Sequence, residues 1–284
     1  MQQAAVDDLI ALLDLEPIEV NIFRGVSPDV ETQRVFGGQV AGQALVAAAR
    51  TVDDERFSVH SMHAYFLRGG DPKVPILYDV DRIRDGRSFT TRRVVAIQHG
   101  RAIFNLQASF HVQEAGLDHQ FPMPTDVAQP EDLPDLKTRW GPWKDKLGEW
   151  YDRPRAIDSR YADWNPPDRK DPLPPRQRVW IRADGTLPDD LLLHTCVLTY
   201  ASDMTLLDTA LLPHGGSYLE GHFMMASLDH AMWFHRPFRA DEWLLYDHDT
   251  PTASDARGLA RGLIYARSGA LVASVVQEGL IRPL

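Results

Sequence analysis

Cysteine is nearly absent from this chain of 284 residues, which contains a single one, Cys196. One cysteine excludes an intrachain disulfide, so packing and hydrogen bonds have to hold the fold. Cys196 lies in the apolar run LLLHTCVLTY, which favours a small core residue over a nucleophile. We therefore expect neither a disulfide nor cysteine chemistry.

The chain also lacks long hydrophobic segments and an excess of basic residues. It contains no run of about 18 apolar residues, so it predicts no membrane-spanning helix. The start, MQQAAVDDLIALLDLE, is acidic without a signal-peptide core, and the end, IRPL, matches no targeting signal. We therefore expect a cytoplasmic protein. The formal net charge of −10 argues against a nucleic-acid binder, which needs a basic face.

A negative net charge is compatible with an anionic small ligand, because a few arginines can dominate the field locally. The candidates lie in predicted strands and turns of both halves: Arg87, Arg92, Arg93, Arg257 and Arg261. The alternative for these residues is ordinary charge on an exposed strand face.

The sequence contains an internal repeat: residues 76–81 (ILYDVD) resemble residues 244–249 (LLYDHD), 168 positions later. The same offset aligns further pairs without a gap, namely Phe66 with Phe234, Arg68 with Arg236, Arg93 with Arg261 and Ala102 with Ala270. Such a match predicts two related units. We assign residues 1–116 to an N-terminal unit, 169–284 to a C-terminal unit and 117–168 to a spacer.

The N-terminal unit is predicted to place one helix against a run of antiparallel strands. Residues 36–50 (FGGQVAGQALVAAAR) form a small-sided apolar helix that needs burial on most of its surface. A further helix is expected at 5–15. Strands are expected at 57–68, 74–84, 89–98 and 102–112, with turns at Asp85-Gly86 and His99-Gly100.

In the C-terminal unit, the apolar run 191–201 is interpreted as a strand that precedes a helix at 203–212. The strands that follow are expected at 223–236, 242–249, 256–266 and 270–281. The spacer is too rich in tryptophan for a flexible linker, so we expect it to pack on one or both units.

One buried helix with a meander of long strands, present twice, predicts an α+β protein. Each antiparallel sheet would wrap a central helix, and the two sheets would join edge to edge into one extended sheet. This arrangement is typical of the hotdog fold in its double form.

Long strings in both halves resemble those of the TesB-type acyl-CoA thioesterases. They include VFGGQVAGQAL and FNLQASFH in the first half, and YASDMTLLDTALLPHG, ASLDHAMWFHRPF and LVASVVQEGLIR in the second. The resemblance covers essentially the whole chain. It implies a double hotdog that hydrolyses fatty acyl-CoA thioesters, without a metal or redox cofactor. It also implies association into homo-oligomers, as dimers or tetramers.

The resemblance further implies that an Asp, a hydroxyl residue and a Gln hold the attacking water. These match Asp203 in YASD, Ser227 before Leu-Asp-His, and Gln277 in VVQEG. Many relatives have Thr where this chain has Ser227, which keeps the hydroxyl and lacks the methyl. Taken alone, Asp203 is a helix N-cap, and Ser227 and Gln277 are satisfied buried polar groups.

The first unit lacks this trio, so we expect one complete site per chain, in the second unit. At offsets of 167 and 168 residues, His60 aligns with Ser227 and Ser109 with Gln277. No acid of the first unit aligns with Asp203.

Two further groups are candidates for substrate contacts. Gly37 and Gly38 open the first buried helix, where N–H groups can stabilise an oxyanion, although tight packing explains the glycines equally well. His60 is a candidate for a substrate contact or a base, against the alternative of core packing. His60 and His63 cannot share a metal ion, because residues three apart on a strand face opposite sides.

Other enzyme classes have weaker support. No G-x-S-x-G string is present, which excludes the usual α/β-hydrolase site. Residues 163–168 (DWNPPD) approach a hydratase string but lack its histidine. The remaining alternative is a non-catalytic protein that binds acyl-CoA on the same fold.

Overall fold

The structure, a computed structural model, describes residues 2–28, 33–215 and 222–284. The strands of the first half are β1 (Glu16–Glu19), β2 (Ile22–Gly25), β3 (Phe57–Phe66), β4 (Ile76–Asp85), β5 (Phe89–Gln98) and β6 (Arg101–Val112). Those of the second half are β7 (Ile157–Tyr161), β8 (Arg176–Ala183), β9 (Phe223–Ser227), β10 (Asp229–Phe234), β11 (Leu244–Ser254), β12 (Arg257–Ala266) and β13 (Leu271–Pro283).

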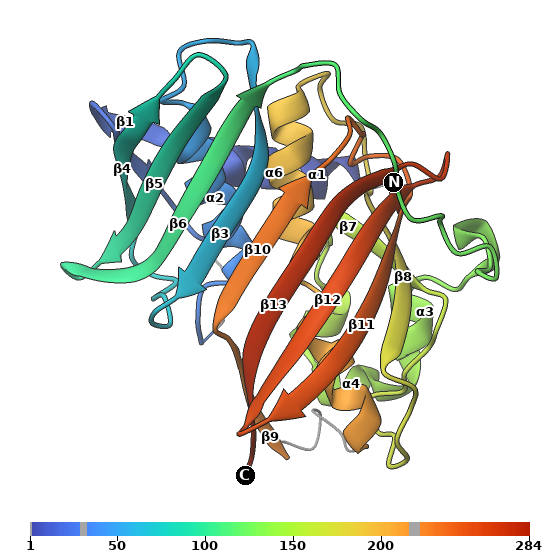
Figure 1. Ribbon diagram of the computed structural model, residues 1–284. Helices are drawn as coiled ribbons and strands as arrows, with labels where there is room; N and C mark the ends of the chain where they lie inside the picture. The colour runs from blue at the N-terminus through green and yellow to red at the C-terminus, as the bar shows by residue number, and fades with distance from the viewer. Residues whose placement is uncertain (1, 29–32, 216–221) are drawn as a thin grey trace.

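These strands form one antiparallel sheet in the order β1-β2-β4-β5-β6-β3-β10-β13-β12-β11-β8-β7, with β9 beside β13 (Figure 1). The order on one side of the central β3–β10 pair mirrors the order on the other. In that central pair, Met62 lies opposite Met232. The predicted α+β fold, in which two helix-wrapping sheets join edge to edge, is confirmed.

Three long helices lie together behind the sheet: α1 (Gln3–Leu13), α2 (Gly37–Ala49) and α6 (Leu191–Ser202) (Figure 1). The shorter helices are η1 (Pro130–Asp132), α3 (Leu136–Trp140), η2 (Gly141–Trp143), α4 (Lys144–Leu147), α5 (Glu149–Asp152) and η3 (Leu207–His214). In the part of the chain that the structure describes, no helix is long and apolar enough to cross a membrane.

The meander strands were predicted to within two residues, except that β11 continues to Ser254 and that the run 223–236 divides into β9 and β10. The short strands β1, β2, β7 and β8 were not predicted. β7 comes from the segment that we assigned to the spacer, and it pairs with β8.

The interpretation of 191–201 as a strand is wrong, because this run is α6, the central helix of the second half. Its N-cap, Asp190, accepts hydrogen bonds from the N–H groups of Leu192 (2.9 Å) and Leu193 (3.2 Å). The helix predicted at 203–212 is instead a turn followed by η3. A helix buried on nearly all sides shows no amphipathic period, so its sequence resembles a buried strand.

The helices α2 and α6 cross so closely that glycine is required on α2. A Cβ on Gly38 would lie 2.3 Å from the carbonyl oxygen of Tyr200, and one on Gly42 would lie 3.3 Å from that of Cys196. The same Gly42 Cβ would lie 3.0 Å from Leu13 of α1. The central helices of the two halves therefore meet backbone to backbone.

The spacer segment covers the outer face of the second half of the sheet, the face away from α2 and α6. Trp180, Leu245 and Tyr265 pack there in a cluster with Val127. Trp180 Nε1 donates to the carbonyl oxygen of Ala128 (2.9 Å). In Figure 1 the segment leaves β6 and crosses to the far end of the sheet, beside β8.

The close crossing of α2 and α6 predicts that any larger side chain at Gly42 lowers the stability of the fold. We expect Gly42→Val to lower the free energy of unfolding by about 1–3 kcal/mol, because its methyl groups would displace Leu13 or α6. Urea unfolding measures the change. The control is Gly116→Val, where a Cβ meets nothing within 4 Å and a change within about 0.5 kcal/mol is expected. Equal stability of the two variants would contradict the close crossing.

Candidate functional site

Asp203 lies where the central helices of the two halves meet. It is the C-cap of α6, so our expectation that it begins a helix is wrong. Its carboxylate instead faces the first turn of α2: a Cβ on Gly37 would lie 2.6 Å from Asp203 Oδ2. The Gly38 N–H also hydrogen-bonds to the carboxylate. The helix terminus that favours the anion therefore belongs to α2, in the other half of the chain.

Gln277 holds the carboxylate from the sheet side. Its Nε2 donates to Asp203 Oδ1 at 2.7 Å. The side chain is fully buried on β13, opposite Ala260 of β12. Its Oε1 is buried and has no hydrogen-bond partner among the described residues. The amide thus directs its donor at Asp203 and keeps an acceptor for a hydroxyl group or a water molecule.

Ser227 ends β9 and pairs with Gly279 of β13. Paired residues share a face of the sheet, as do residues two apart on a strand, so Ser227 and Gln277 lie on the same face. A Cβ on Gly279 would contact Leu207 of η3, which identifies this as the inner, helix-covered face. Within the described residues no hydrogen bond joins Ser227 directly to Asp203 or Gln277.

Aromatic side chains close the junction around Asp203. The Phe66 ring lies 2.9 Å from the place that a Cβ on Gly37 would occupy. Phe36, the residue before α2, packs edge to face on Tyr200 of α6, with ring centroids 5.1 Å apart. These rings restrict water around the carboxylate.

This desolvation raises the pKa of Asp203 to about 6, although the hydrogen bonds from Gln277 and Gly38 act in the opposite direction. The charge of nearby Asp208, on η3, adds to the rise. Desolvation also raises the pKa of Asp208 to about 6. A carboxylate with such a pKa is a stronger base than a solvated aspartate and is still mostly ionised at neutral pH.

Buried polar groups behind Asp203 fix the end of α6, and we did not predict them from the sequence. Ser202 Oγ lies 2.9 Å from Nε2 of the buried His230. The Ser202 carbonyl oxygen accepts a hydrogen bond from the Tyr246 hydroxyl at 3.2 Å. A usable signal for the burial of His230 was its position two residues before Met232, because the two side chains share one face of β10 and both are buried.

The first half has no counterpart of the glutamine. In the first half, Arg92 of β5 pairs with Ala108 of β6. Ala260, the repeat counterpart of Arg92, pairs with Gln277. Ala108 therefore occupies the position of Gln277. The alignment of Ser109 with Gln277 is therefore wrong by one residue.

His60 does not correspond to Ser227 either. The pairing of β3 with β6 has a register shift between Val59 and Ser61. Because of this shift, Val59 rather than His60 occupies the position that Ser227 has in the second half. His60 Nε2 lies 2.8 Å from Ser109 Oγ, on the outer face. Burial and the neighbouring His111 lower the pKa of His60. These contacts place His60 on the opposite face of the sheet from Asp203.

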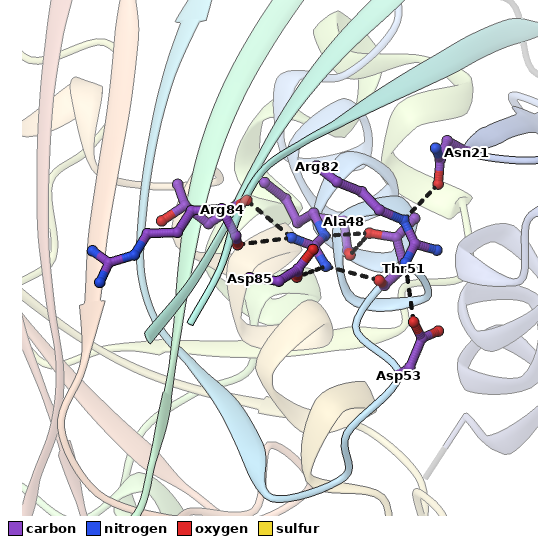
Figure 2. Close-up of polar contacts among 9 residues, drawn as sticks. Asn21, Ala48, Thr51, Asp53, Arg82, Arg84 and Asp85 are labelled. Carbon is purple, nitrogen blue, oxygen red and sulfur yellow. Dashed lines mark hydrogen bonds and ion pairs between the residues drawn. The ribbon is translucent and has the colours of Figure 1, made fainter. Parts of the chain in front are cut away.

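Arg92, one of the candidates for binding an anionic ligand, is instead buried in the first-half counterpart of the site. Its side chain is 1 % exposed. The guanidinium donates to Thr51 Oγ1 (2.8 Å), Asp85 Oδ1 (2.6 Å) and the carbonyl oxygen of Arg84 (3.1 Å). Figure 2 shows Thr51, Arg84 and Asp85 gathered in this network at the end of α2. Arg92 therefore ties α2 to the β4–β5 hairpin.

The other arginine candidates lie away from Asp203. Three form ion pairs on the outer face: Arg93 with Asp81 (3.1 Å), Arg257 with Glu278 (3.0 Å) and Arg261 with Asp249 (2.7 Å). Arg87 is exposed in the β4–β5 turn. Across the described ranges, no three His, Cys, Asp or Glu side chains are grouped to hold a metal ion.

A curved sheet that wraps two crossing helices, with a carboxylate at their crossing, defines a double-hotdog protein. A hot dog fold protein from Alicyclobacillus acidocaldarius shares this fold, with a TM-score of 0.77 at 17% identity, over 99% of this chain and 98% of that one. The acyl-CoA thioesterase family model matches residues 168–280, and the model of the acyl-CoA thioesterase N-terminal domain matches 26–111. The chain belongs to the acyl-CoA thioesterase family.

Similar proteins extend over nearly the whole chain. Acyl-coenzyme A thioesterase 8 of Mus musculus is 46% identical over 96% of this chain and 88% of its own length. Acyl-CoA thioesterase 2 of Haemophilus influenzae is 41% identical over 98% of both chains. The acyl-CoA thioesterase II TesB2 structure from Mycobacterium marinum has a TM-score of 0.79 at 46% identity, over 98% of both chains.

Adjacent arginines on β5 allow a test of the first-half network. We expect Arg92→Ala to lower the free energy of unfolding by about 2–4 kcal/mol, because it leaves buried acceptors unpaired. Arg93→Ala removes an exposed ion pair and should cost less than about 1 kcal/mol. Thermal and urea unfolding measure both. Similar losses for the two variants would show that the Arg92 network does not stabilise the fold.

Proposed function

We propose that this protein hydrolyses acyl-CoA thioesters to the free acid and CoA with a water molecule held by Asp203, Ser227 and Gln277. No metal or redox cofactor takes part. The 2.7 Å hydrogen bond between Gln277 and Asp203, at the first turn of α2, carries the proposal. Membership in the acyl-CoA thioesterase family supports the substrate class. The cytoplasmic location and the association into homo-oligomers stay predictions from the sequence.

In the proposed reaction, Asp203 takes a proton from the water molecule while the oxygen of that water adds to the thioester carbonyl carbon. Gln277 Oε1 and the Ser227 hydroxyl orient that water. The tetrahedral intermediate then expels the CoA thiolate and leaves the carboxylic acid. The proton on Asp203 passes to the thiolate or to solvent, which restores the base.

The negative oxygen of the intermediate needs a donor, and the first turn of α2 can supply one. The N–H groups that open a helix have no partner within it, and one such donor is worth roughly 3 kcal/mol to an oxyanion. We assign this role to the Gly37 N–H. A side chain at position 37 would collide with Asp203 Oδ2, so glycine lets the carboxylate and this N–H share one site.

Replacement of the base tests the proposal against the non-catalytic alternative. We expect Asp203→Asn to lower the rate of thiol release from acyl-CoA by about 10²–10⁴-fold, with substrate affinity kept. A thiol-reactive dye measures release, and Asp81→Asn on the outer face serves as the control. If wild type binds acyl-CoA but releases thiol no faster than Asp203→Asn, the protein is a binding protein.

The raised pKa of Asp203 predicts the pH dependence of the reaction. The base is active when ionised, so kcat should rise with pH through about 6 and level off above it. Asp208→Asn removes a negative charge that disfavours ionisation, so its pH profile should shift towards acid. Single-turnover rates between pH 4.5 and pH 8 measure both profiles. A wild-type profile flat over this range would exclude Asp203 as the titrating base.

A further inference from the structure

A basic hollow of about 320 Å³ opens on the first half of the molecule, beside the loop that leads into α2. It is lined by Arg68, Gly69, Asp71, Gln98, His99, Arg101 and Ile103. Two arginines and a histidine face one carboxylate, in a chain whose net charge is −10. This balance favours an anionic ligand.

Arg34 adds a third arginine to the hollow. A Cβ on Gly69 would lie 3.0 Å from Arg34 Cδ, so the Arg34 side chain extends over Gly69. The next residue, Val35, donates its N–H to the carbonyl oxygen of Gly70 (3.0 Å). The loop before α2 and the loop after β3 thus form one wall.

The floor of the hollow is held in place by the protein itself. Gln98 Nε2 donates to the carbonyl oxygens of Asp71 (2.9 Å) and Val74 (2.6 Å), and its Oε1 accepts from the Asp71 N–H (2.8 Å). The Asp71 carboxylate accepts from the Lys73 N–H (2.9 Å) and lies 3.4 Å from His99 Nε2. Lys73 and His99 therefore already contact Asp71, the single acid that lines the hollow.

The three arginines keep donors for a ligand. Arg68 donates one hydrogen bond, from Nη1 to the carbonyl oxygen of Ala102 (2.6 Å). Within the described part of the chain, no carboxylate forms an ion pair with Arg34, Arg68 or Arg101. All three side chains are exposed. Guanidinium groups in this state bind phosphate through paired N–H donors.

In the second half, acidic side chains pair with the arginines at the equivalent position. Arg236, the repeat counterpart of Arg68, donates to the carbonyl oxygen of Leu271 (2.9 Å), as Arg68 does to Ala102. Another Arg236 nitrogen forms an ion pair with Asp118. In the β12–β13 hairpin, Arg267 pairs with Glu131 at 2.7 Å. Acids of the segment after β6 thus neutralise the second-half arginines, whereas among the residues that the structure describes no acid pairs with the three first-half arginines of the hollow.

The hollow lies within reach of the reaction centre. A Cβ on Gly37 would lie 2.6 Å from Asp203 Oδ2. Arg34 precedes Gly37 by three residues, which span at most about 11 Å. In CoA, the pantetheine arm separates the sulfur from the phosphate groups. We propose that this hollow binds the phosphate groups of the CoA portion of the substrate, through Arg34, Arg68 and Arg101. The inference rests on the proposed acyl-CoA hydrolysis.

Two substrates with the same acyl group separate phosphate recognition from chemistry: an acyl-CoA, and the acyl-pantetheine that lacks the phosphates. We expect Arg68→Gln combined with Arg101→Gln to raise KM for acyl-CoA at least tenfold and to leave kcat and the KM for acyl-pantetheine unchanged. The control pair, Arg56→Gln with Arg176→Gln, removes equal charge at two distant exposed arginines, which pair with Asp54 and Asp247, and should leave both KM values unchanged.

Other outcomes overturn the inference. KM values that change equally for both substrates, or for neither, would show that the hollow does not bind the phosphates. A wild type that hydrolyses neither substrate would refute the proposed function instead. Calorimetric titration with free CoA then tests the hollow by itself: at least tenfold weaker binding by the double variant supports it, and equal affinity refutes it.

Discussion

The contact between the Asp203 carboxylate and the first turn of α2 is the constraint on which the site depends. It joins residues from opposite halves of the chain, and it exists because Gly37 and Gly38 have no side chains to separate the helices. The same close approach desolvates the carboxylate, which raises its pKa to about 6, while the helix N-terminus and Gln277 keep the ionised form accessible. Packing and base strength therefore have one structural cause.

In the proposed reaction, the two halves of this repeated architecture contribute different groups. The second half would supply Asp203, Ser227 and Gln277. In the first half, Ala108 stands at the position of Gln277 and Val59 at that of Ser227, and the buried Arg92 network lies beside Ala108. In exchange, the first half contributes the first turn of α2 and the open basic hollow. We infer that substrate spans the junction, with its acyl carbonyl near one half and its phosphates near the other.

Sequence alone predicted the long strands and the doubled architecture, because alternation and turn residues are local signals. It did not predict α6, whose burial on nearly all sides removes the amphipathic period. The Asp203–Gly37 contact depends on how the helices cross, and local sequence carries no record of that crossing. The burial of Arg92 had a usable signal: it shares a strand face with Val94 and Ala96, both fully buried. The counterpart of Ser227 was missed by one residue, because a register shift in β3 is invisible to a gap-free repeat.

A crystal structure of the Asp203→Asn variant with an uncleaved acyl-CoA tests this division of labour most directly. We expect one acyl-CoA per chain, with the thioester carbonyl between residue 203, Gln277 and the first turn of α2. A thioester bound beside the Arg92 network, or on the outer face of the sheet, would contradict it.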